Sequence, residues 1–224
     1  MLRTRLKVCC IASPAEAALA IHLGADAVGL VGEMPSGPGP IDDALIATIA
    51  RSVPPPVATF LLTCRTRAAD IVAHVLATGV NTVQLVDEVD DDTFALLRDR
   101  APHVRIVQVL HVQDKSVLAD ADRLAPNVDA FLLDSGRPNA AIRELGGTGR
   151  THDWTLSARL VAQSPRPVFL AGGINPANVQ DAIRAVRPFG IDLCSGVRTN
   201  GALDEGKLRA LVSAIRAADN DLRM

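Results

Sequence analysis

The sequence predicts an α/β fold, a single-domain (β/α)8 TIM barrel, from three observations. Short apolar runs alternate with stretches of helical spacing along the whole chain. The apolar runs are nearly continuous, which is typical of parallel strands that are covered on both faces. Eight such units in 224 residues give about 28 residues per unit, near the lower size limit of this barrel.

Each predicted strand is a short run rich in Val, Ile, Leu and Ala. The eight runs are Leu6–Ile11, Ala27–Val31, Val57–Leu62, Thr82–Leu85, Val104–Leu110, Ala130–Leu133, Val168–Ala171 and Ile191–Cys194. The spacing of Ala and Leu between them predicts helices, with a weaker one after Leu110. These helices cover Pro14–His22, Ile41–Ser52, Ala68–Ala77, Thr93–Arg100, Leu156–Gln163, Asn178–Val186 and Asp204–Ala218.

An open, doubly wound sheet is the competing architecture. Its dinucleotide fingerprint G-x-G-x-x-G is missing from the first predicted strand-to-helix turn, which reads Cys-Cys-Ile-Ala-Ser over residues 9–13. No Ser/Gly linker divides the chain, and the Pro/Gly patch at 35–40 fits a loop after the second strand. We therefore predict one barrel domain over residues 1–224.

Composition excludes several classes of function. The chain has 23 Lys and Arg against 25 Asp and Glu, so it lacks the basic field that holds nucleic acid. No apolar run approaches bilayer length, which predicts no membrane association. The four cysteines show neither zinc spacing nor the density of a disulfide scaffold, and we interpret them as reduced thiols of a cytoplasmic protein. The acidic run at 87–92 is expected to support the helix starting near Thr93 and not to bind a metal.

Two glycine turns predict a phosphate site. In barrels of this kind phosphate is often held by the loops after the seventh and eighth strands. Gly172 and Gly173 end the seventh strand, and Ser195 and Gly196 end the eighth. Without a Cβ, glycine lets a phosphate approach backbone N–H groups closely. Each turn alone more often marks a tight bend, whereas the two together favour a phosphate site.

Several short segments, taken in their order along the chain, match the sequence pattern of one enzyme family. The specific parts are Gly-Gly-Thr-Gly at 146–149 with Asp-Trp at 153–154, and the two glycine turns. The common parts are Lys-Val-Cys at 7–9, Gly-Ala-Asp-Ala-Val-Gly at 24–29, Val-Gln-Leu at 83–85 and Leu-Leu-Asp at 132–134. Together these segments resemble phosphoribosylanthranilate isomerase of tryptophan biosynthesis. The resemblance implies a (β/α)8 barrel that acts without a cofactor on a phosphorylated aminoaldose.

The resemblance also implies the catalytic groups of an Amadori rearrangement. Asp134 is expected to protonate the furanose oxygen, and the Cys9 thiolate to remove the C2′ proton. A free thiol has a pKa near ~8.5, so a cysteine base needs an electropositive neighbour, for which Lys7 is available. Residues two apart on a strand share a face, so Lys7 and Cys9 are expected inside the barrel, with Cys10 facing the helices. The alternative for Lys7, slightly favoured, is a structural ion pair with Asp192.

Three departures from the family pattern concern the substrate. The loop at 32–40 lacks the family's arginine for the anthranilate carboxylate, which leaves Arg65 or Arg67 as substitutes, although solvated charges are the simpler interpretation of both. The family's Gln-Leu-His is Gln84-Leu85-Val86 here, and His111 is a weak substitute for the histidine. Cys10 replaces the glycine after the family cysteine, which restricts the backbone there.

The predicted function is conversion of N-(5-phosphoribosyl)anthranilate to 1-(2-carboxyphenylamino)-1-deoxyribulose 5-phosphate. Two alternatives stay open: a paralogue that isomerises a different phosphorylated sugar amine, and a non-catalytic sugar-phosphate-binding protein. The expected substrate contacts are Lys7, Arg65, Gln84, His111 and Gly147. The expected partner is a small phosphorylated sugar, with no metal, and the chain is expected to be a monomer or a homodimer.

Overall fold

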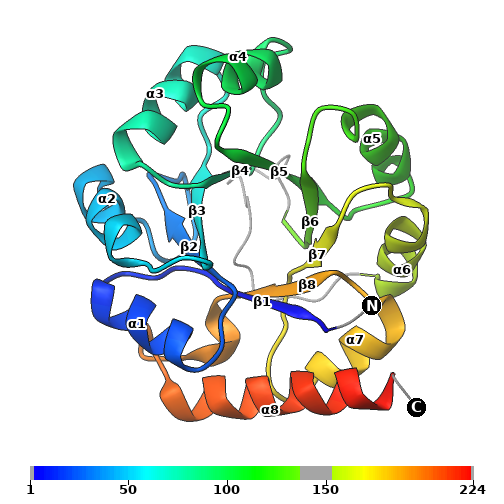
Figure 1. Ribbon diagram of the computed structural model, residues 1–224. Helices are drawn as coiled ribbons and strands as arrows, with labels where there is room; N and C mark the ends of the chain where they lie inside the picture. Colours follow the sequence, from blue (N-terminus) through cyan, green and yellow to red (C-terminus); the bar gives the residue numbers. More distant parts are fainter. Residues whose placement is uncertain (1–2, 137–152, 223–224) are drawn as a thin grey trace.

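Eight parallel strands form a closed barrel surrounded by helices (Figure 1). The computed structural model describes residues 3–136 and 153–222. Neighbouring strands pair in chain order, and β8 returns to pair with β1, which closes the ring. The prediction of a (β/α)8 barrel is therefore confirmed.

The strands and helices lie close to their predicted positions. The barrel strands are β1 (Arg5–Val8), β2 (Ala27–Val31), β3 (Ala58–Thr63), β4 (Thr82–Leu85), β5 (Arg105–His111), β6 (Ala130–Asp134), β7 (Val168–Leu170) and β8 (Gly190–Leu193). The helices are α1 (Pro14–His22), α2 (Asp43–Ser52), α3 (Ala68–Thr78), α4 (Thr93–Arg100), α5 (Ser116–Leu124), α6 (Trp154–Gln163), α7 (Val179–Val186) and α8 (Glu205–Asp221). The weak helix predicted after Leu110 is α5.

Several helices begin where a side chain accepts a hydrogen bond from the first turn. Ser13 accepts from the backbone N–H of Glu16 at 3.1 Å before α1, and Asp42 accepts from Leu45 at 2.7 Å before α2. Asp92 occupies the corresponding position before α4 but makes no capping hydrogen bond. The acidic run therefore adjoins the helix start as predicted, without a side-chain cap at Asp92.

The barrel separates two apolar cores. The larger one lies between strands and helices and contains the outward-facing residues of the strands, such as Val8, Val28 and Leu61. The smaller one fills the barrel interior, where Phe60 and Phe169 pack edge to face at 6.0 Å. Strand alternation sends successive residues to these two cores, which explains why the strands read as continuous apolar runs.

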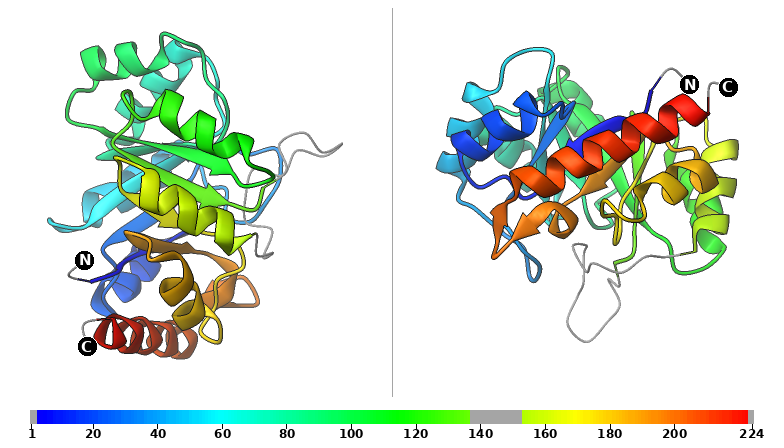
Figure 2. Two further views of the ribbon diagram at one scale, coloured as in Figure 1. Left: turned by 90° about the vertical axis from the view of Figure 1, so that its right-hand side faces the viewer. Right: turned by 90° about the horizontal axis from the view of Figure 1, so that it is seen from below.

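The sequence analysis did not predict the short elements after β8. A 3-10 turn, η1 (Ser195–Val197), leads into a small antiparallel pair, β9 (Arg198–Thr199) and β10 (Ala202–Leu203). At the other end of the barrel the start of β1 lies beside the end of α8, where the Thr4 backbone N–H donates to Asp219 at 2.9 Å (Figure 2). Within the described part of the chain, no helix is long and apolar enough to span a membrane.

Candidate active site

A pocket opens at the carboxyl ends of the barrel strands. It encloses about 750 Å³ of space, part of it open to solvent. Residues from seven of the eight strands or the loops that follow them reach it, which is where barrels of this kind carry their chemistry. Its lining comprises Cys9, Cys10, Val31, Met34, Ser36, Gly37, Pro38, Leu62, Gln84, Val86, Asp134, Ala171, Gly172, Gly173, Ile174, Asp192, Leu193, Cys194 and Ser195.

Cys9 follows β1 and faces the pocket, as predicted. Its backbone N–H donates to the Leu193 carbonyl at 2.8 Å, which extends the β1–β8 pairing by one residue. Gly29 on β2 leaves the space that this side chain needs, because a Cβ there would lie 2.8 Å from Cys9 Sγ and 3.1 Å from Lys7 Nζ. The Cys9 thiol and the Lys7 ammonium therefore both lie in the barrel interior, next to the space that Gly29 leaves free.

Cys10 does not face the helices, so that prediction is wrong. It has a φ of 61°, in the left-handed region, which ends the strand alternation directly after Cys9. The Cys10 side chain consequently turns into the pocket, where its Sγ contacts the Pro38 carbonyl at 3.5 Å. The residue that replaces the family's glycine thus occupies a conformation typical of glycine.

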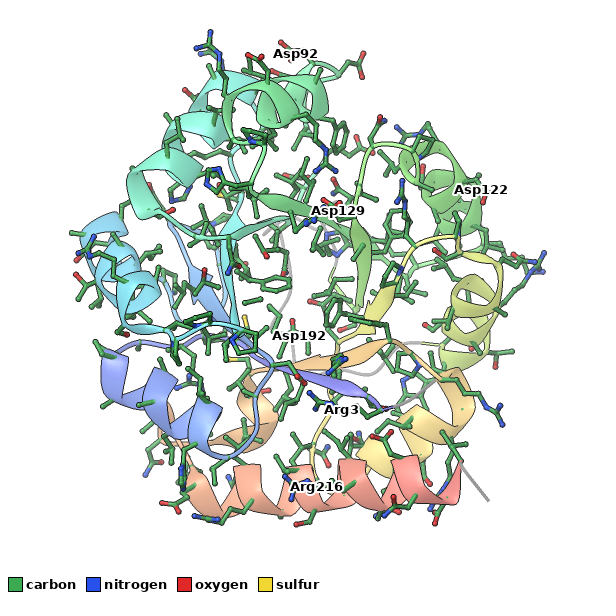
Figure 3. The ribbon with its side chains drawn as sticks, viewed as in Figure 1. Arg3, Asp92, Asp122, Asp129, Asp192 and Arg216 are labelled. Carbon is green, nitrogen blue, oxygen red and sulfur yellow. The ribbon has the colours of Figure 1, made fainter. Side chains whose placement is uncertain are left out.

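Lys7 and Asp192 form a buried ion pair, which confirms the structural alternative. Lys7 Nζ lies 2.8 Å from Asp192 Oδ1, and the lysine side chain is fully buried. Figure 3 shows Asp192 inside the ring of strands, whereas Asp122 and Arg216 lie on outer helices. Burial alone would lower the pKa of Lys7, but Asp192 and the Cys9 thiol outweigh it and raise this pKa. Lys7 therefore stays cationic, and its charge also acts on Cys9.

Asp134 ends β6 and lines the pocket. Burial raises its pKa, and the charge of Asp192 adds to the rise. The backbone N–H of Ser135 donates to Asp134 Oδ1 at 2.6 Å and partly opposes that shift. A carboxyl whose proton is held by its environment suits a general acid.

His111 lies opposite Asp134 in the β5–β6 register, outside the pocket lining. Its Nε2 donates to the Val86 carbonyl at 3.0 Å. Its Nδ1 is buried and has no hydrogen-bond partner among the described residues. The structure thus places this histidine beside the acid, where its charge favours the ionised form of Asp134.

The two predicted glycine turns meet at one side of the pocket. Gly172 and Gly173 have φ values of 84° and 66°, which other residues adopt only under strain, and both line the pocket with Ser195. Gly196 instead packs against the first turn, since a Cβ there would lie 2.1 Å from the Ile174 carbonyl oxygen. The glycine at 196 is therefore required for the close approach of the two turns.

The opposite side of the pocket is apolar. Val31, Met34, Leu62 and Val86 line it, and none of the described lining residues is Arg, Lys or His. Ser36 and Gln84 are the polar side chains on this side, and Gln84 has a buried Oε1 that has no hydrogen-bond partner among the described residues. An unpaired buried acceptor costs free energy, so a ligand that donates to Gln84 would gain affinity.

The structure does not bring the two proposed substitute arginines into the pocket. Arg65 donates to the Asp70 carbonyl at 3.2 Å and lies 3.6 Å from Asp43, and it points toward α2 and α3. Arg67 is 78% exposed and adjoins Asp70. Both fit the simpler interpretation of solvated charges. Gly147 and the Gly-Gly-Thr-Gly motif lie outside the described residues.

Three pocket residues or supports were not predicted. Cys194 lines the pocket, and Arg198 holds the turn at Cys9 and Cys10 through their carbonyl oxygens. Glu16 on α1 fixes that arginine with two contacts of 3.1 Å. The contact between Arg198 and Glu16 joins segments far apart in the sequence, so it leaves no periodic pattern. The signal in the sequence is that both residues are charged within mainly apolar segments. In the described part of the chain, no group of three His, Cys, Asp or Glu residues is placed to hold a metal ion.

Comparison with known proteins assigns this arrangement to a family. Residues 6–214 match the family model described as N-(5'phosphoribosyl)anthranilate (PRA) isomerase. The chain is 38% identical to N-(5'-phosphoribosyl)anthranilate isomerase 2 of Methanosarcina mazei, covering 97% of this chain and 95% of that protein. It is also 38% identical to the isomerase of Haloferax volcanii, over 96% of this chain and 94% of that one. A crystal structure of phosphoribosyl anthranilate isomerase with reduced 1-(o-carboxyphenylamino)-1-deoxyribulose 5-phosphate superposes with a TM-score of 0.76 at 26% identity, covering 96% of this chain and 99% of that one.

Proposed function

Because the chain belongs to the N-(5'-phosphoribosyl)anthranilate isomerase family, we propose that Cys9 and Asp134 are its catalytic base and acid. The enzyme is an isomerase of tryptophan biosynthesis and converts N-(5'-phosphoribosyl)anthranilate to 1-(2-carboxyphenylamino)-1-deoxyribulose 5-phosphate. The observation that carries the proposal is that the pocket presents both groups, one after β1 and the other at the end of β6. The strands β7 and β8 lie between β6 and β1. A sugar bound in the pocket would therefore have the Cys9 thiol on one side and the Asp134 carboxyl on the other.

Ring opening is the first proton transfer. Asp134 gives its proton to the furanose oxygen, the C1′–O bond breaks, and the nitrogen lone pair forms the C1′=N bond of a Schiff base. The raised pKa of Asp134, caused mainly by its burial, keeps this proton available at higher pH than for an exposed aspartate.

Removal of the C2′ proton is the second transfer. The Cys9 thiolate takes this proton, and the electron pair of the C–H bond forms an enolamine while the iminium charge is neutralised. Protonation at C1′ and loss of the O2′ proton then give the aminoketose, so the overall change is an isomerisation without a cofactor. The buried Lys7 ammonium is the cation that shares the barrel interior with Cys9.

The phosphate is assigned to the two glycine turns. The donors are the backbone N–H groups of Gly172, Gly173, Ser195 and Gly196. The three glycines have no Cβ that would shield these groups from a phosphate. The lining contributes no cationic side chain at this point among the described residues. Binding by backbone donors therefore accounts for the phosphate without an arginine or lysine. We assign Gln84 to a substrate hydroxyl or amine donor because its buried Oε1 lacks a partner among the residues that the structure describes.

The alternative of a paralogue with another aglycone rests on one observation. The described lining has no cation to pair with an aryl carboxylate, and a charge-assisted hydrogen bond is worth about 1.5–3 kcal/mol. Family membership and the 38% identity to two named isomerases favour the anthranilate substrate. A pure binding protein would have no use for the acid and the thiol in one pocket.

The test is turnover of freshly prepared phosphoribosylanthranilate, followed by loss of its fluorescence. Cys9→Ala and Asp134→Asn are each expected to lower kcat by about 10²–10⁴-fold, the usual contribution of a general base or acid. Cys64→Ser and Asp120→Asn are matched controls outside the pocket and are expected to keep wild-type rates. Wild-type activity in either pocket variant would refute the assigned role. Slow turnover of the anthranilate substrate together with rapid turnover of a decarboxylated analogue would favour the paralogue.

A cytoplasmic location and a monomeric or homodimeric state complete the proposal. The four cysteines are free, which suits a reducing compartment. Light scattering of the purified chain distinguishes the two oligomeric states, and a larger assembly would contradict this part of the proposal.

A further inference from the structure

We propose that Cys10 and Cys194 form an oxidisable thiol pair at the edge of the pocket, which a peroxide converts to a disulfide and a thiol reductant restores. This modification site goes beyond the isomerisation and does not depend on the roles assigned to Cys9 and Asp134.

The barrel topology brings the two thiols together from the ends of the chain. β1 pairs with β8 with Val8 opposite Leu193, so the residues that follow each strand emerge side by side. The left-handed φ of 61° at Cys10 ends the strand alternation, and both cysteines line the pocket. The Cys10 thiol donates to the Pro38 carbonyl at 3.5 Å and interacts electrostatically with the Cys194 thiol. The two thiols therefore lie at the same edge of the pocket.

Arg198 makes the two thiols chemically different. Its side chain is only 9% exposed, and its Nε is buried without a hydrogen-bond partner among the described residues. The interaction with Cys10 and the charge of Arg198 lower the pKa of Cys194, although burial opposes them. Interactions with Cys194 and with Cys9, aided by burial, raise the pKa of Cys10. Cys194 is accordingly the more acidic of the two thiols and Cys10 the less acidic, the arrangement that suits an attacking and a resolving cysteine.

The oxidation balances with one peroxide. The Cys194 thiolate attacks one oxygen of H₂O₂, the O–O bond breaks, and the products are a sulfenic acid and hydroxide. The Cys10 sulfur then displaces the sulfenic oxygen, the S–S bond forms, and the Cys10 proton leaves with that oxygen as water. Two thiols and one H₂O₂ give one disulfide and two waters, with two electrons passing from sulfur to oxygen.

The disulfide would lie between the Cys9 turn and the start of η1. It would tie the loop after β1 to the loop after β8, two loops that line the same pocket. We therefore expect turnover to fall when the pair is oxidised and to return with dithiothreitol. Cys64 is a built-in comparison, since it lies after β3, outside the pocket lining.

The experiment treats the full chain with H₂O₂, counts free thiols under denaturing conditions and maps cross-linked peptides by mass spectrometry. The free-thiol count is expected to fall from four to two, with one intramolecular cross-link. Cys9→Ala resolves which neighbouring cysteine reacts: the cross-link to Cys194 should persist in this variant. It should also persist in Cys64→Ser, and it should be lost in Cys194→Ser and in Cys10→Gly, whose glycine suits the left-handed backbone.

Several results would overturn the proposal. One is a cross-link that disappears in Cys9→Ala, because Cys9 would then be the partner of Cys194. Others are four free thiols after treatment, or oxidation to sulfinic acid without a cross-link. Because the cross-link is read by mass, failure of the assigned role of Cys9 leaves this test unaffected.

Discussion

The two sides of the pocket differ in how they hold polar groups. The side built from β6, β7, β8 and β1 carries Asp134, Asp192, Cys9 and the glycine turns, each tied into the barrel by pairing or hydrogen bonds. The side built from β2, β3 and β4 is apolar except for Ser36 and Gln84, and the Oε1 of Gln84 lacks a partner among the described residues. The first side fixes the groups that react with the sugar. The second side provides an apolar surface and the Gln84 Oε1 acceptor. Chemistry and recognition are thus assigned to different strands of one ring.

The largest effect is expected from breaking the buried ion pair on the polar side. Asp192→Asn leaves the fully buried Lys7 without its anion, and loss of one partner of a buried pair costs about 3–5 kcal/mol in the free energy of unfolding. Urea denaturation measures this loss. Asp120→Asn is the control, because it breaks an exposed pair with Arg123 and should change stability by less than about 1 kcal/mol. Equal effects of the two substitutions would mean that the interior pair is not a major stabilising contact.

The contact between the two glycine turns is the next point to break. Gly196→Ala places a Cβ against the Ile174 carbonyl oxygen and forces the turns apart, with an expected cost of about 1–3 kcal/mol. We expect KM to rise about tenfold, which corresponds to about 1.4 kcal/mol of binding, and kcat to change less. Gly206→Ala is the control, since its Cβ would lie 3.4 Å from the nearest atom, and its KM should stay at the wild-type value. An unchanged KM in Gly196→Ala would separate these turns from phosphate binding.

Gln84→Met tests the apolar side. Removing an unsatisfied buried acceptor should leave the free energy of unfolding unchanged or raise it by up to about 1–3 kcal/mol. The same variant should lose about tenfold in kcat/KM if the substrate donates to Gln84. Steady-state kinetics and urea denaturation of one preparation measure both. A destabilised variant with full activity would show that Gln84 supports the barrel and not the substrate.

Asp134→Asn is expected to give the smallest change in stability, and this change depends on pH. Burial raises the pKa of Asp134, so the folded state retains the proton after the unfolded chain has lost it, and this lowers stability as pH rises above the unfolded value. Asparagine does not titrate, so the variant does not lose this stability as pH rises. The difference in Tm, variant minus wild type, should therefore be larger at pH 8 than near pH 4. A difference that shrinks as pH rises would contradict the raised pKa.

The sequence predicted the polar side of the pocket better than its surroundings. Strand ends, glycine turns and family motifs are local signals, and they located Cys9, Asp134 and the two turns correctly in the barrel. The orientation of Cys10 was missed because it depends on one backbone angle beyond the strand end. Arg65 was offered as a pocket residue, but Asp43 and the Asp70 carbonyl, which lie on α2 and α3, hold it elsewhere. Arg198 was missed because its partners, Glu16 and the Cys10 carbonyl, are distant in the chain. Contacts of this kind depend on the assembled fold and leave no periodic pattern.

The most direct test of the acid and base assignment is the pH dependence of kcat/KM between about pH 5 and pH 9. A reaction that needs the Cys9 thiolate and the protonated Asp134 in the free enzyme should give a bell-shaped profile. The residual activity of Cys9→Ala and of Asp134→Asn should each lack one limb of that bell. A flat wild-type profile, or a bell that both variants retain in full, would contradict the central claim that these two residues transfer the protons.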